Sequence, residues 1–406
     1  EMINGDWSSD VCSSDLTFTR THMTFMLHSL VDNGLLEDDS AHYAFVTYNQ
    51  SVISEACKNV ILSIGNDMDA VSLESKKRIK VLMEFMGVGL SLPVNESQSM
   101  TIARELYRGW IEDPSFFGDA TRQNKYLRRI IKQLSQPFQI KVPDNYSCIS
   151  DSFYQLLLKI LDDYNFIQKG KGPLLDYDTW KTLLYTLIMI TDKLITTNFD
   201  GLLTPEKTSA LIQKSVNSTI SVILLSGLNS KELWDTLLKY GFEWCNNIDF
   251  AYCWRILTSK LFELLLSIVY GLDDLNFSAE EINDDNKTRK ELISFWFFKC
   301  LNLMNVSLVT NKNVIMEINK TIANVTDITI KYSKLKSNFI EVKFSGKSFI
   351  RLFGKFIYFA KRCNTGPEFS INIQTIIKII SFFELDGIKE EIMKYIIYFL
   401  SFESFQ

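Results

Sequence analysis

Apolar residues recur at spacings of three and four along most of this chain, and the pattern is clearest between Tyr177 and Ile195. This spacing places the apolar side chains on one broad face of a helix. The face is formed by Trp180, Leu183, Leu184, Leu187, Thr191, Leu194 and Ile195. Asp178 lies just ahead of the apolar run and is predicted to cap the helix, because its carboxylate can accept from first-turn N–H groups. A face this broad needs other helices to cover it.

The same periodicity predicts helices in the rest of the chain, separated by short polar breaks that contain glycine or proline. The predicted segments are a short helix ending near Gly34, then Gln50–Ile64, Lys76–Leu90, Asn95 or Ser97 to Trp110, Arg122–Gln136, Asp151–Tyr164, Thr204–Leu225, Asn229 or Ser230 to Gly241, Ile248–Tyr270, Lys287–Leu308 and Ser345–Cys363, with two more between Ile371 and Leu400. The expected fold class is all-α, an α-solenoid of degenerate HEAT/armadillo-like helical hairpins. No clean sequence repeat is visible, so the structural repeats are expected to be degenerate.

Three regions are predicted within this array. Residues 17–272 form an N-terminal helical solenoid, and the acidic, polar stretch 273–286 is a linker. Residues 287–406 continue the solenoid, with an irregular segment at 310–347 where the helical period is lost. Ile328, Ile330 and Tyr332 alternate there, so either a short strand or a loop fits that segment.

The first residues have an unusual sequence. The stretch Asp6–Leu16 back-translates, codon by codon, into one reading frame of a common sequencing-library adapter. We interpret residues 1–16 as an adapter-derived artefact and exclude them from fold reasoning; the alternative is a genuine tail rich in serine and aspartate. On this interpretation the chain is expected to be a fragment of a longer protein.

Composition and charge exclude several classes of function. The net charge of -5 over 406 residues argues against a nucleic-acid-binding surface. Seven cysteines are scattered without C-x-x-C spacing, which excludes common zinc and redox motifs and favours a reducing, cytoplasmic location. The longest uncharged run, Ser215–Ser230, is too short and polar for a transmembrane segment.

No catalytic, cofactor-binding or metal-binding residues are predicted. Gly346–Ser348 resembles the end of a phosphate-binding loop, but Glu341 stands where the motif requires glycine. The histidines at 22, 28 and 42 lie in the least ordered part of the pattern, which disfavours a triad or metal site. Two short runs of basic residues, Lys76–Arg78 and Arg128–Arg129, are interpreted as parts of solvated helix faces. The tryptophans at 180, 234, 244, 254 and 296 are interpreted as core anchors.

Several stretches, taken in order, resemble the N-terminal region of the Ral GTPase-activating protein beta subunit. They are Ile79–Pro93, Leu106–Trp110, Tyr126–Phe138, Thr179–Leu194, Leu233–Trp234, Trp244, Trp254–Leu266, Val269–Gly271, Phe295–Phe297 and Ser348–Tyr358. The alpha subunit and tuberin are weaker matches. The region after Thr310 departs from the family pattern, because it is much shorter than the usual low-complexity insert.

The resemblance implies a helical scaffold in a complex that accelerates GTP hydrolysis on a Ras-family GTPase. In that family the GTPase-activating domain lies at the far C-terminus, and the catalytic asparagine belongs to the alpha subunit. No residue here matches a catalytic position, so the expected partner is a catalytic alpha-type subunit that forms a heterodimer with this chain. The alternative is a generic helical-repeat adaptor unrelated to GTPase activation. The residues that bind a partner stay unknown at this stage.

Overall fold

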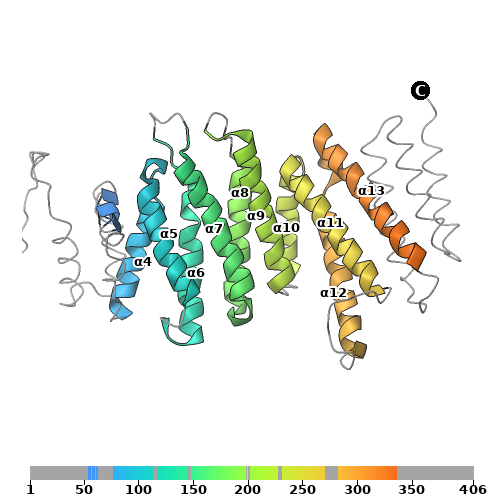
Figure 1. The fold of residues 1–406 in the computed structure, drawn as a ribbon, viewed down its shortest axis with the longest axis horizontal. Helices are drawn as coiled ribbons and strands as arrows, with labels where there is room; N and C mark the ends of the chain where they lie inside the picture. The colour runs from blue at the N-terminus through green and yellow to red at the C-terminus, as the bar shows by residue number, and fades with distance from the viewer. Residues whose placement is uncertain are drawn as a thin grey trace, which may run out of the picture. The chain divides into compact units, whose positions relative to one another are not determined.

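The computed structural model describes residues 54–55, 57–59, 61–62, 76–113, 117–143, 148–197, 199, 202–226, 231–269 and 282–335 (Figure 1). The chain divides into two compact units, Glu1–Ser226 and Gly227–Gln406. Every regular element in the described ranges is a helix, so the predicted all-α solenoid is confirmed. No helix in the described part of the chain is both long enough and apolar enough to cross a membrane.

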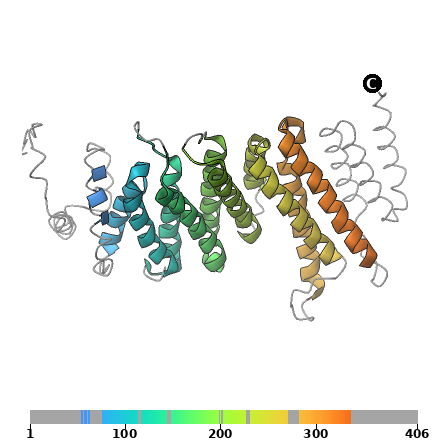
Figure 2. The ribbon, with the colours of Figure 1, turned by 45° about the horizontal axis from the view of Figure 1, so that its top comes forward.

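The first unit contains six long helices arranged in two rows. They are α4 (Lys76–Leu90), α5 (Ser97–Glu112), α6 (Ala120–Leu134), α7 (Asp151–Gly170), α8 (Tyr177–Thr196) and α9 (Pro205–Ser226). Each helix contacts the next but one, so α4, α6 and α8 form one row and α5, α7 and α9 form the other. The views in Figures 1 and 2 show this serial stacking. A single helix of this kind cannot bury its apolar face alone, and stacking of neighbours produces a continuous core.

In the described part of the second unit, each helix again contacts the next but one. The helices are α10 (Lys231–Trp244), α11 (Ile248–Val269), α12 (Ile282–Leu303) and α13 (Lys312–Leu335). α12 packs against both α10 and α11, and α11 also packs against α13. Arg255 and Glu263 on α11 pair with Glu317 and Lys331 on α13, which places the two helices side by side and parallel.

Most of the core outside α13 is formed by residues that the periodicity selected. In α8, the side chains of Trp180, Leu183, Leu184 and Leu187 are buried. The tryptophans at 234, 244 and 254 are also buried, as predicted, whereas Trp296 is only half-buried.

The predicted helix caps were wrong in two places. Asp176, and not Asp178, caps α8, because its side chain accepts from the Thr179 N–H while Asp178 already lies in the first turn. Neither Asn95 nor Ser97 caps α5. A short 3₁₀ turn, η1 (Val94–Glu96), leads directly into that helix, and the residue before it makes no capping bond.

The irregular segment predicted at 310–347 is also wrong over most of its length. Residues Lys312–Leu335 form α13, the longest helix in the described ranges. Val314, Ile318, Ile322 and Val325 are its buried face, at helical spacing. Interleaved asparagine, threonine and lysine residues obscured that period in the sequence.

The predicted domain boundaries differ from the compact units. The units divide between Ser226 and Gly227, whereas the linker was predicted at 273–286. Residues 282–286 of that predicted linker belong to α12. The helix predicted at Asp151–Tyr164 is longer than expected: α7 extends to Gly170, because Ile167 and Gln168 continue its buried face.

Several predictions lie outside the described residues: the adapter-like segment 1–16, the three histidines, residues 273–281, the Gly346–Ser348 motif and the helices after 344.

Candidate functional site

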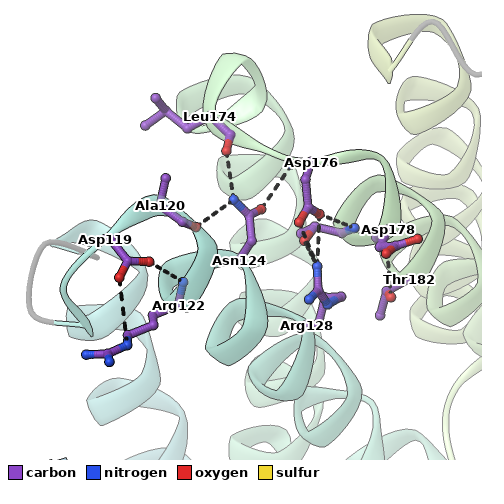
Figure 3. A network of polar contacts seen from close by, with 10 residues as sticks. Asp119, Ala120, Arg122, Asn124, Arg128, Leu174, Asp176, Asp178 and Thr182 are labelled. Atoms are coloured by element: carbon purple, nitrogen blue, oxygen red, sulfur yellow. Dashed lines mark hydrogen bonds and ion pairs between the residues drawn. The ribbon is translucent and has the colours of Figure 1, made fainter.

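A polar network joins the N-terminal ends of α6 and α8 through a short 3₁₀ turn, η4 (Gly172–Leu174) (Figure 3). Its centre is Asn124, a buried residue on α6. The Asn124 Nδ2 group donates to the carbonyl oxygens of Ala120 at 3.0 Å and Leu174 at 3.1 Å. Its Oδ1 atom accepts from the Asp176 N–H at 3.1 Å. Asn124 thus fixes the start of α8 against α6.

Asp176 completes the network on the α8 side. Its carboxylate accepts from the Thr179 N–H at 2.7 Å and from Arg128 Nη1 at 2.8 and 3.0 Å. Partial desolvation raises the pKa of the Asp176 carboxyl, but the hydrogen bonds from Thr179 and Arg128 outweigh that effect, so the pKa is lowered overall. The ionised form of Asp176 is therefore the form that stabilises the fold.

We expect Asp176→Ala to lower the free energy of unfolding by about 1 kcal/mol at neutral pH, because α8 loses its cap. Asp176→Asn should recover most of this loss, since asparagine caps equally well. A carboxyl with a lowered pKa stabilises above its unfolded pKa, near 3.9, and loses that effect as the pH falls. The difference between wild type and Asp176→Ala should therefore shrink below about pH 4 in urea titrations. A pH-independent difference would contradict the role of the carboxylate.

A small pocket lies beside this network. Its apolar walls are Trp110, Ile111, Phe117, Leu127, Leu174 and Leu175, and polar side chains complete the lining. The rings of Trp110 and Phe117 meet edge to face, with centroids 5.8 Å apart. Leu174 is 62% exposed, so part of the apolar lining is open to solvent. Apolar anchors with a polar rim are typical of surfaces that bind a protein partner.

The basic pair Arg128–Arg129 differs from the solvated helix face that was predicted for it. Arg129 pairs with Glu84 on α4, and Arg128 pairs with Asp176, the N-cap residue of α8. Both arginines therefore connect neighbouring helices of one row. The sequence could not reveal these pairs, because each joins residues more than forty positions apart. The side chains of Lys76–Arg78 lie outside the described set.

No group of three or more His, Cys, Asp or Glu side chains in the described ranges is placed to hold a metal ion. Burial raises the pKa of the Cys57, Cys253 and Cys300 thiols to about 12, which keeps them protonated and unreactive.

Comparison with known proteins gives one informative match. Residues 150–272 match the model of the RALGAPB N-terminal domain. The predicted resemblance to the Ral GTPase-activating protein beta subunit is confirmed for this segment, which runs from α7 through α11. A search of curated proteins finds no match.

Among solved structures, the chain is similar to a circular tandem repeat protein with novel repeat topology and enhanced subunit contact surfaces. The sequence identity is 11% and the TM-score is 0.28, with 89% of this chain and 84% of that chain covered. A similarity this low supports no conclusion about the arrangement of the helices or about function.

Proposed function

We propose that this chain is a non-catalytic helical scaffold of a Ral-type GTPase-activating complex. It works in the cytoplasm without a cofactor, and it binds a catalytic alpha-type subunit. That subunit promotes GTP hydrolysis on a Ras-family GTPase, which this chain contacts only through its partner. The observation that carries the proposal is the match of residues 150–272 to the RALGAPB N-terminal domain.

Two features of the fold support a scaffold. Serially stacked helices offer an extended surface to a partner, and each helix contributes side chains to it. The pocket beside Asn124, with Leu174 exposed in its lining, provides the apolar anchors that protein interfaces use.

The test is complex formation between the purified 406-residue chain and a purified alpha-type catalytic subunit. We expect a stable heterodimer in gel filtration and a saturable isotherm in calorimetry. An unrelated helical-repeat protein of similar size serves as the control for non-specific association. Failure of the chain to bind the alpha-type subunit at micromolar concentrations would contradict the proposal.

A further inference from the structure

The outer face of α6 is strongly basic in a chain whose net charge is negative. α6 contains five basic residues and no acidic residue, while the whole chain has a net charge of -5. The basic residues are Arg122, Lys125, Arg128, Arg129 and Lys132, here called the α6 basic stripe. Their spacing places them on one side of the helix, opposite the buried Leu127, Ile130, Ile131 and Leu134.

The charge is confined to one row of the first unit. α4, which packs beside α6, contains four basic residues and one acidic residue. In the other row, α5 contains two residues of each sign, α7 contains two lysines and three aspartates, and α9 contains two lysines and one glutamate. This difference in charge makes the exposed side of α6 attractive to an anionic partner.

The stripe is unfavourable for the free helix. Lys125 and Arg129, and Arg128 and Lys132, are like-charged pairs one turn apart, and such pairs destabilise a helix. Arg122 lies in the first turn, where the helix dipole disfavours a cation. The ion pairs of Arg128 with Asp176 and of Arg129 with Glu84 offset part of this cost. Lys125 and Lys132 add like charge without a carboxylate partner among the described residues, so folding gives no evident reason for these two.

Two members of the stripe are available to a partner. Arg128 and Arg129 are engaged by Asp176 and Glu84, and Arg122 lies 3.7 Å from Asp119. Lys125 and Lys132 are exposed, and neither has a carboxylate partner among the described residues. They are seven residues apart on one face, about 10 Å along the helix axis.

We propose that the α6 basic stripe docks an acidic segment of the partner subunit, with carboxylates of that segment opposite Lys125 and Lys132. This inference rests on the scaffold function proposed above and names the surface through which it acts. Leu174, whose carbonyl oxygen accepts from Asn124 in the polar network, is 62% exposed and can receive an apolar residue of the same segment (Figure 3). A protein segment fits better than an anionic membrane, because Glu84, Asp119 and Asp176 are interspersed with the cations and repel a continuous anionic surface.

The test compares three forms of the 406-residue chain: wild type, K125E/K132E and the control K159E/K260E. The control makes the same change in net charge at two exposed lysines, on α7 and α11, outside the stripe. Binding to the purified alpha-type subunit is measured by calorimetry at low and high salt, and the melting temperature of each form is measured alone. Vesicles containing one third phosphatidylserine are the second probe.

We expect K125E/K132E to bind the alpha-type subunit at least tenfold more weakly than wild type and to lose most of the salt dependence, while the control binds normally. The melting temperature of K125E/K132E should be unchanged or higher than that of wild type. A carboxylate at position 125 stands one turn before Arg129 and relieves the repulsion between Lys125 and Arg129. That result separates lost binding from lost folding.

Three results would overturn the inference in distinguishable ways. Equal binding by all three forms would exclude this surface but leave the scaffold function intact. Absence of binding by wild type would remove the scaffold function and the inference together. Vesicle binding by wild type that K125E/K132E loses, with unchanged binding to the alpha-type subunit, would assign the stripe to a membrane instead.

Discussion

Replacing Trp254 by alanine should lower the free energy of unfolding by about 3–5 kcal/mol. Trp254 lies on α11 with none of its surface exposed. Its indole Nε1 donates to the Cys300 carbonyl oxygen on α12 at 2.8 Å, so the side chain supplies both packing and a buried hydrogen bond between the two helices. Alanine leaves a large cavity at the α11–α12 contact, and a close-packed interior closes such a cavity only in part.

Urea denaturation checks the size of this effect, and hydrogen exchange locates it. Met316→Ala is the matched control in the same unit, because Met316 is 52% exposed and its loss should change stability by less than about 0.5 kcal/mol. Protection should fall mainly in α11 and α12 of the Trp254→Ala variant. A loss below about 1 kcal/mol would show that these helices do not pack around this side chain.

Replacing Asp163 by alanine should also be strongly destabilising, by about 3–5 kcal/mol. Asp163 lies on α7 with a fully buried side chain, and it joins α7 to α5. Its Oδ2 atom accepts from Arg104 Nε at 2.6 Å, and its Oδ1 atom accepts from Arg108 Nη1 at 3.2 Å. Without the carboxylate, the Arg104 guanidinium, whose side chain is only 12% exposed, is left as an uncompensated charge.

A double variant separates the charge from the packing. Removing both charges in Arg104→Met/Asp163→Leu should restore much of the stability, because an apolar pair avoids the unpaired charge. Arg108 retains Glu112 as a partner at 2.6 Å in that variant. If the double variant were as unstable as the sum of the two single variants, the unpaired charge would not be the cause of the loss.

The sequence predicted most helices of this fold because their apolar residues repeat without interruption. Lys76–Leu90 matches α4 at both ends, and the apolar face between Trp180 and Leu194 is the buried face of α8. α13 was missed because its apolar positions are separated by polar residues that are common in loops. The α8 cap was misassigned because two aspartates, Asp176 and Asp178, stand near the start of the helix, and only backbone geometry distinguishes them.

The candidate site was only partly visible in the sequence. The charges of α6 can be read directly, but their pairing cannot, since Arg129 meets Glu84 across 45 positions. Likewise, Asn124 shows no motif: its role follows from the approach of η4 and α8 to the end of α6. Contacts between distant segments depend on how the helices stack, and a single sequence does not specify that register.

GTP hydrolysis by a Ral-type GTPase is the measurement that tests the scaffold proposal most directly. The rate is compared for the GTPase with the 406-residue chain, with the alpha-type subunit, and with both together. We expect the chain alone to leave hydrolysis at its intrinsic rate and the combination to exceed the alpha-type subunit alone. Acceleration by the chain alone would show that it carries catalytic groups, and a combination no faster than the alpha-type subunit would show that it is not a functional scaffold for that partner.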